Sequence, residues 1–447
     1  MTSGSVHGGH PASGGSSHGG GPRVASHKYG EAARVRAAPL PRVFPNAALW
    51  YPSGRGRLVA RQRDLCGPAR PAWCRDRRGI ALSSVAELIA GKRVVVCAGS
   101  GGVGKTTTAA ALGMGAAALG AKVAVVTIDP ARRLANSLGL AELGNEPQRI
   151  DPARFTEHGV EMRGELWALM LDAKRTFDEL IARLAPDRRT LEEVLGNRIY
   201  QQLSSAVAGS QEFTAIAKLY DLDQSGDFDL LVLDTPPSRN ALDFLDAPTR
   251  LTGFFHGRAI KVFLRPAGVG SRIIAGGTGV AFGLLRRVVG VDLLADLSVF
   301  FRALGGMIDG FVARAERVGA LLADPATTFL IVTSPRHDPI EEAIFFHRKL
   351  REAGMPFGGL VVNRTHAAPS SNGQVLPGLA AELGDTLAAR VATSARELAA
   401  LAARDAANVA HLRAALGDEH EGRVPERQDD VHDIEGLAHV RMHLWGG

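Results

Sequence analysis

The chain has 447 residues, of which 45% are hydrophobic, so it is long enough to bury the core of one large or two ordinary domains. Its three cysteines, Cys66, Cys74 and Cys97, have a spacing that fits neither a zinc cluster nor a disulfide framework. No uncharged apolar run reaches the ~18 residues needed to cross a bilayer, and residues 1–22 do not resemble a signal peptide. These features argue against a disulfide-rich or membrane-spanning protein, and we predict a cytoplasmic one.

The net charge of +6 is distributed unevenly along the chain. Residues 1–80 hold 13 Lys or Arg against 3 Asp or Glu, which leaves 39 basic and 43 acidic side chains in residues 81–447. The first segment lacks the apolar periodicity of a helix or strand, so we predict a disordered basic leader, or one that precedes the start codon used in the cell. Because the remaining body is slightly acidic, we expect no nucleic acid among its partners.

A glycine-rich segment separates the first predicted strand, residues 93–98, from an alanine-rich helix. Residues 99–106 read Gly-Ser-Gly-Gly-Val-Gly-Lys-Thr, and a strand, such a loop and a helix in this order bind polyphosphate. Glycine lets successive backbone N–H groups converge on phosphate oxygens, and the helix N-terminus adds partial positive charge. We therefore predict ATP and Mg²⁺ as ligands, with Lys105 on the β- and γ-phosphates and Thr106 on the metal. The predicted nucleotide contacts in this segment are Gly101, Gly102, Val103, Gly104, Lys105, Thr106 and Thr107.

Further apolar runs alternate with helical patterns along the chain. This alternation predicts an α/β fold of the P-loop NTPase type, in which a mostly parallel sheet is flanked by helices. Ligands of such sheets bind at the carboxyl ends of the strands, where Asp129, Asp234 and Asn363 follow three of the runs. The predicted strands after the first are residues 122–128, 166–171, 228–233, 327–333 and 358–362.

Four motifs at these strand ends together resemble the arsenite-pump and tail-anchored-protein-targeting ATPases, a family of anion-transporting ATPases with a deviant phosphate-binding loop. The motifs are residues 99–107, Asp129-Pro130-Ala131, Asp234-Thr235-Pro236-Pro237 and Val362-Asn363. The resemblance spans about residues 85–445. It implies one ATPase domain over residues 81–447, with a helical subdomain at about 245–325, that works as a nucleotide-gated dimer.

The resemblance also implies roles for single residues. Asp129 would activate the attacking water as a catalytic residue beside Lys105, Asp234 would hold the magnesium shell, and Asn363 would hydrogen-bond adenine. Pro425 lies in a segment that resembles the family's adenine-covering loop, and Pro237 and Ser238 would belong to the second switch. Read from the residues alone, Asp129 could instead cap a helix before Pro130, and Asn363 could stabilise a turn.

The chain departs from the family at Ser100, where the deviant loop carries a signature lysine that reaches the partner subunit's phosphates. Arg132, Arg133 and Arg239 occupy switch positions where the family has other residues, so one of them could supply the missing cation. The other solution is a heterodimer with a related subunit that keeps the lysine. A homodimer that relies on neither should hydrolyse ATP slowly.

The cargo is the least determined part of the interpretation. The arsenite pump's paired cysteines and the targeting factors' dimer-bridging CxxC have no counterpart here, and residues 251–322 predict helices that pack within the subdomain or dimer. We expect an ATPase that couples its nucleotide state to a protein partner, possible membrane proteins included, so that membrane association would be transient. A regulatory subunit that hydrolyses little is the alternative, and a partitioning ATPase is a third.

Overall fold

The computed structural model describes most of the chain beyond residue 83, and the predicted leader, residues 1–80, lies outside the described residues. None of the described helices is long and apolar enough to cross a membrane. The described residues are 84–129, 132–201, 208–236, 300–301, 303–369, 378–417, 421–427 and 430–446.

Eight strands form a single sheet in the order β3-β4-β2-β5-β1-β6-β7-β8. All neighbouring pairs are parallel except β3 and β4, so the predicted mostly parallel α/β sheet is confirmed. The central strands are short runs of buried β-branched and leucine side chains, as strands covered on both faces require. The strands are β1 (Val94–Ala98), β2 (Lys122–Thr127), β3 (Gln148–Arg149), β4 (Glu165–Met170), β5 (Leu230–Asp234), β6 (Thr327–Thr333), β7 (Phe357–Thr365) and β8 (Glu421–Pro425).

Alternate side chains of each strand enter two separate hydrophobic cores, because successive residues of a strand point to opposite faces. In β1, Val95 and Cys97 belong to one core and Val94 and Val96 to the other. The first core is closed by α2 (Ser84–Ile89), α3 (Lys105–Ala118), α4 (Arg133–Ser137), α5 (Ala153–Thr156) and α19 (Ile434–Trp445).

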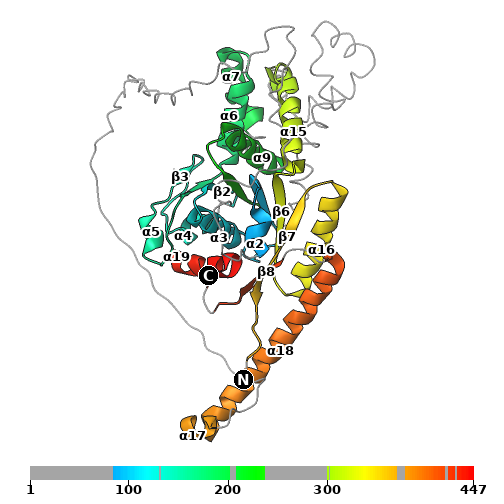
Figure 1. Cartoon of the computed structure of the whole chain (residues 1–447). Helices are drawn as coiled ribbons and strands as arrows, with labels where there is room; N and C mark the ends of the chain where they lie inside the picture. The colour runs from blue at the N-terminus through cyan, green and yellow to red at the C-terminus, as the bar shows by residue number, and fades with distance from the viewer. Residues whose placement is uncertain are drawn as a thin grey trace, which may run out of the picture. The chain divides into compact units, whose positions relative to one another are not determined.

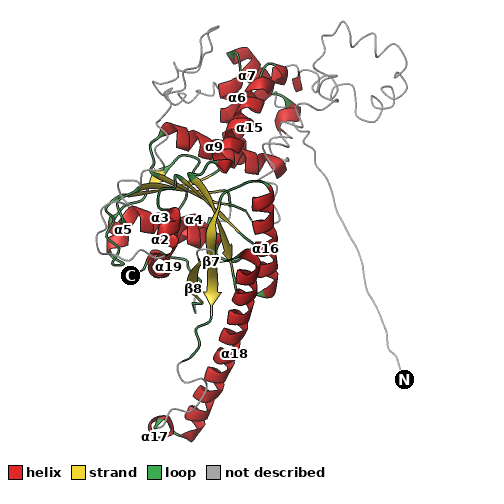
Figure 2. Ribbon diagram, turned by 45° about the vertical axis from the view of Figure 1, so that its right-hand side comes forward, coloured by secondary structure: helices red, strands yellow, loops and turns green. Residues whose placement is uncertain are grey.

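The opposite face is covered by α9 and α15, by α16 (His337–Glu352) and by the C-terminal half of α18 (Asp385–Leu416). At one end of the molecule α6, α7, α9 and α15 gather into a helical cluster, which Figures 1 and 2 show above the sheet. Its aromatic core includes Phe177, which stacks on Tyr200 and Phe311 at centroid distances of 6.0 and 5.9 Å. The helices of this cluster are α6 (Ala173–Leu184), α7 (Arg188–Leu195), α9 (Ala208–Ser225) and α15 (Ile308–Ala323).

This cluster contains helices from outside the predicted helical subdomain. Inside the predicted span of about 245–325 the described residues include α15 and a short helical stretch at 300–305, of which residue 302 is not described. Residues 237–299 lie outside the described residues, so that boundary stays a prediction. The helices of residues 173–225, which pack against α15 through α9, come from a separate insertion between β4 and β5. We predicted no subdomain there, because these helices of 12, 8 and 18 residues leave no motif at a strand end.

The packing of α19 on α3 depends on one glycine. A Cβ on Gly115 would lie 2.0 Å from Nε1 of Trp445, whose indole N–H donates to the carbonyl of Ala111. We expect Gly115→Ala to lower the thermal midpoint by overpacking, at a cost of about 1 to 3 kcal/mol, although alanine is the better helix former.

The matched control is Gly319→Ala, since a Cβ on that helical glycine meets nothing within 4 Å. This substitution should raise the free energy of unfolding by about 0.5 to 1 kcal/mol and therefore raise the thermal midpoint. Equal shifts for the two variants, measured by circular dichroism, would contradict the contact between α3 and α19.

Candidate functional site

The glycine-rich loop runs from the end of β1 into α3 and passes very close to its neighbours. A Cβ on Gly99 would lie 1.9 Å from the carbonyl oxygen of Val332 in β6, which leaves room for glycine alone. Gly104 has a φ of 92°, and a Cβ there would meet the side-chain amide of Asn363 at 2.2 Å. The loop is therefore held between β6 and β7 in a shape that directs the N-terminus of α3 outward.

Lys105 begins α3 and folds back over the loop. Its Nζ donates to the carbonyl oxygen of Ser100 at 2.8 Å, and the side chain is buried. Burial lowers the pKa of the Lys105 ammonium, and the nearby carboxylates of Asp234 and Asp129 oppose that shift. The Lys105 ammonium is thus a buried cation at the loop with two carboxylates near it.

A buried carboxylate lies directly under the start of α3. Oδ2 of Asp234 accepts hydrogen bonds from Thr106 Oγ1 at 2.6 Å and from Thr127 Oγ1 at 2.9 Å. Oδ1 is also buried, yet it has no hydrogen-bond partner among the described residues. A hard divalent cation that ligates the Thr106 hydroxyl and carries water to the free carboxylate oxygen would satisfy this set of oxygens.

Thr127 is a site residue that the sequence reading missed. It ends β2 directly beside Asp234 in the parallel ladder, and its Oγ1 also accepts the backbone N–H of Asp129 at 3.2 Å. One hydroxyl therefore connects the two acidic strand ends. The available signal was the register of β2 against β5, which no single motif contains.

Asp129 lies just beyond β2 with about a quarter of its side chain exposed. Arg133, in the first turn of α4, donates from Nη1 to its Oδ2 at 3.1 Å. Arg132 has a left-handed backbone, with φ at 57°, and turns toward Glu142 at 3.5 Å. Of the arginines predicted as substitute cations, Arg133 is thus the one beside Asp129. Arg239, with Pro237 and Ser238, lies outside the described residues.

Asn363 and Pro425 occupy different distances from the loop. The side-chain amide of Asn363 donates to the carbonyl of Val103 at 2.9 Å, so this residue closes the loop from the side of β7. Pro425 is the last residue of β8, paired with Thr365 one strand further out. The segment that resembles an adenine-covering loop is an edge strand up to Pro425, because Arg423 and Val424 pair with β7.

Ser100, which replaces the signature lysine, is buried, and its hydroxyl has no hydrogen-bond partner among the described residues. Gly101 and Gly102 beside it are exposed. Residue 100 therefore provides no positive charge to the loop.

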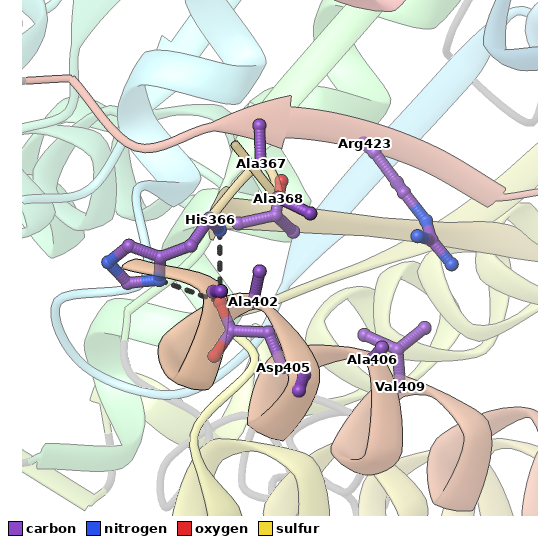
Figure 3. A pocket seen from close by; sticks show the side chains of 11 residues that line it. His366, Ala367, Ala368, Ala402, Asp405, Ala406, Val409 and Arg423 are labelled. Atoms are coloured by element: carbon purple, nitrogen blue, oxygen red, sulfur yellow. Dashed lines mark hydrogen bonds and ion pairs between the residues drawn. The ribbon is translucent and has the colours of Figure 1, made fainter. Parts of the chain in front are cut away.

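A concavity of about 490 Å³ lies between the end of β7 and α18, apart from the glycine-rich loop. Figure 3 shows its lining, mostly alanine side chains with His366, Asp405 and Arg423. None of the loop residues 99–106 lines it. The nucleotide-binding chemistry is thus gathered at the loop rather than in this cavity.

Comparison with known proteins supports the resemblance. Residues 92–269 match the family model described as anion-transporting ATPase. A protein of Aquifex aeolicus that carries the name arsenical pump-driving ATPase 1 is 27% identical over 256 residues, which cover 56% of this chain and 58% of that protein. The ATPase get3 of Aspergillus terreus is 29% identical over 36% of this chain and 44% of its own length, and the ATPase GET3 of Malassezia globosa is 28% identical over 35% and 43%. The matched segments thus cover about half of these relatives.

The buried Asp234 carboxyl predicts a pH-dependent stability in the absence of metal. Burial raises its pKa from 3.8 to about 6, although both threonine hydroxyls and Lys105 pull in the other direction. Between these two values the folded protein binds more protons than the unfolded chain, so the free energy of unfolding falls as pH rises through this window, by about 3 kcal/mol in total.

Asp234→Asn should remove that slope, and in EDTA at pH 8 we expect it to unfold at a higher temperature than the parent chain. Asp227→Asn, an exposed carboxylate close by in the chain, is the control and should leave the slope unchanged. Thermal melts between pH 4 and 8 measure both, and parallel slopes for the parent and Asp234→Asn would contradict the shift.

Proposed function

We propose that this chain, whose residues 92–269 match the family model described as anion-transporting ATPase, binds ATP with Mg²⁺ and hydrolyses it. The observation that carries the proposal is the hydroxyl of Thr106 on the buried Asp234 carboxylate, with one carboxylate oxygen free and Lys105 beside it. A buried acid at a strand end has no structural reason to keep an orphaned oxygen, whereas a bound metal shell gives it one.

In this proposal the loop supplies binding and charge. The backbone N–H groups of Gly101, Gly102, Val103 and Gly104, with the start of α3, bind the phosphates. Lys105 leaves the carbonyl of Ser100 and neutralises the β- and γ-phosphate oxygens. Thr106 and Asp234 would hold magnesium, Asp234 through a water molecule, and Thr107 would bind a further phosphate oxygen. Magnesium held there would supply positive charge opposite the transferred phosphoryl group.

The base side of the site belongs to β7 and β8. Asn363 already touches the loop through Val103, so its amide can bind the edge of adenine while it holds the loop. Pro425, at the end of the neighbouring strand, covers the same side. Both assignments follow the family resemblance and the positions of these strands.

Asp129 is proposed to orient the attacking water and accept its proton. Its position beyond β2, partly exposed and held through Thr127, faces the same corner as Lys105. Arg133 pairs with its carboxylate, and this ion pair must loosen for Asp129 to act. Release of Arg133 toward the phosphates would provide both a free base and a cation.

The proposed assembly is a homodimer or a heterodimer with a related subunit. Ser100 carries no charge, so the cation that the family supplies across the dimer must come from Arg133, from Arg132 or Arg239, or from the partner. A trans-acting cation on the transferred phosphoryl group is worth about 10³ to 10⁵ in rate. The same deficiency favours the second candidate function, a nucleotide-binding regulatory subunit with low turnover of its own.

We further propose that the chain works in the cytoplasm, where its nucleotide state changes its interaction with a protein partner. That partner can be a membrane protein, and we propose no nucleic-acid partner. The relatives are named as a pump-driving ATPase and as GET3 ATPases. The chain matches about half of each, so its own cargo is left to experiment.

The first test is magnesium-dependent ATP affinity and turnover of the purified chain. Lys105→Ala should abolish measurable affinity in calorimetry, a loss of at least about 100-fold, because the phosphates lose their only buried cation among the described residues. Lys349→Ala is the matched control, since that lysine is exposed and paired with Glu352. Equal affinity of the parent chain and Lys105→Ala would overturn the proposal.

The second test separates the enzyme from the regulatory subunit. We expect Asp129→Asn to keep ATP affinity and to lower turnover about 10²- to 10⁴-fold, as loss of a general base does. A parent chain that binds ATP yet shows no turnover above Asp129→Asn would support the regulatory role instead.

The third test concerns the missing lysine. Arg133→Ala should lower turnover more than Arg132→Ala, because Arg133 pairs with Asp129 whereas Arg132 pairs with Glu142. Unchanged turnover in a variant that lacks Arg132, Arg133 and Arg239 together would exclude a cation in the same chain. An increase on addition of a related subunit would then assign it to the partner.

A further inference from the structure

The exposed large apolar side chains of the described residues are concentrated on one hairpin. Of six such side chains, four lie on α17 (Leu379–Leu383) and on the N-terminal half of α18. They are Leu383, Leu387, Val391 and Leu398, with exposed fractions of 42, 46, 41 and 38%. Scattered apolar residues need no explanation, but a cluster on one element indicates a binding surface.

These side chains belong to a stripe that is continuous with the core. Positions 391, 398, 405 and 412 of α18 recur every seven residues and therefore share one helix face. Val391 and Leu398 are exposed, whereas Asp405 and Leu412 are buried at 3 and 0% exposure. Leu387 and Leu401 flank the exposed pair at the intervening positions of the same stripe. The stripe is thus exposed in the N-terminal half of α18 and buried against the body in the C-terminal half.

The C-terminal half of α18 is fixed to the body by polar contacts. Asp405 accepts the backbone N–H of His366 and contacts its Nδ1 at 2.7 Å, as Figure 3 shows. Asn408 donates to the carbonyl of Pro335 at 2.9 Å. The N-terminal half extends past the sheet in Figures 1 and 2. The exposed stripe is therefore presented on an anchored helix.

The flanks of the exposed stripe have opposite character. On one side stand the small side chains Ala388, Ala395 and Ala402, and on the other Arg390, Glu397 and Arg404. Arg390 and Glu397 form no ion pair within the described residues. Ala388 and Ala402 are already buried within the chain, at 2 and 9% exposure. The charged flank is therefore the accessible one, and its charges select the direction of a second helix.

We propose that the exposed half of α18 binds the same segment of a second copy of this chain in an antiparallel pair. With the two-fold axis between Ala392 and Thr393, Leu387 of each copy meets Leu398 of the other. The same register brings Arg390 of each copy next to Glu397 of the other, which gives two symmetric ion pairs. An isologous contact of this kind is self-complementary, as a closed dimer requires.

The charges reject the neighbouring arrangements. A shift of the antiparallel register by one heptad would place Glu397 against its own copy and Arg390 against Arg404, and would bring Leu387 against the buried Asp405. A parallel pair would set Arg390 opposite Ala395, without a charge partner. Only the proposed register joins unlike charges and apolar side chains together.

This inference deepens the proposed function, because it assigns a surface where two copies meet. It does not depend on hydrolysis, since the surface contains none of the residues assigned to nucleotide binding. The two proposals can therefore fail separately: calorimetry with ATP reports on the nucleotide site, and sedimentation reports on the surface of α18.

The test is a charge-reversal series on the full chain, followed by sedimentation velocity at several concentrations. Arg390→Glu and Glu397→Arg should each weaken self-association about tenfold, because each places like charges in two symmetric contacts. The double variant R390E/E397R should restore it. Leu387→Lys with Leu398→Lys should raise the dissociation constant by about 100-fold or more. ATP affinity and the far-UV circular dichroism spectrum should remain unchanged in all of these variants.

A monomeric parent chain, or single and double variants with the same association, would overturn the proposal. Binding of the parent chain, but not of the Leu387→Lys and Leu398→Lys variant, to neutral lipid vesicles without self-association would assign the stripe to a membrane instead. A change in ATP affinity without a change in mass would implicate the nucleotide site rather than this surface.

Discussion

A buried carboxylate at the end of β5 constrains the whole nucleotide site. Asp234 is buried inside the sheet, so its charge is unfavourable unless hydroxyl donors, a lysine or a cation compensate it. Thr106, Thr127 and Lys105 provide part of that compensation. Oδ1 of Asp234 has no hydrogen-bond partner among the described residues. A divalent cation is expected there because it would compensate this buried oxygen.

This constraint links three parts of the chain that are far apart in sequence. Thr106 comes from the start of α3, Thr127 from the end of β2 and Asp234 from β5, and the parallel register brings their side chains within hydrogen-bond distance. Because Thr127 also accepts the backbone N–H of Asp129, a change at the Asp234 carboxylate can reach the backbone of Asp129 through a single hydroxyl. Such a connection is a physical route by which nucleotide state could alter the position of Asp129 and Arg133.

The rest of the molecule divides around the sheet. The helices that cover one face end in α19, whose Trp445 packs on Gly115 of α3, so the C-terminal helix stabilises the helix that begins at the loop. The helical cluster of α6, α7, α9 and α15 and the hairpin of α17 and α18 are additions to this sheet. We propose that the hairpin of α17 and α18 contacts a second copy of the chain, because it exposes a cluster of large apolar side chains.

The amino-acid sequence by itself determined the class of fold and the position of the phosphate-binding loop. Glycines between a β-branched strand and an alanine-rich helix have few other physical uses, and Asp129, Asp234 and Asn363 are visible as the polar residues that follow apolar runs. The structure places Asp234 at the end of β5, Asp129 two residues beyond β2 and Asn363 inside β7. The tertiary structure alone decided which side chains meet. The partnership of Thr127 with Asp234 and the place of residues 421–425 in an edge strand depend on strand register. The pairing of Arg133 rather than Arg132 with Asp129 depends on the local backbone at the start of α4. Register is set by packing between segments that are far apart in the chain, and local sequence patterns carry no record of it.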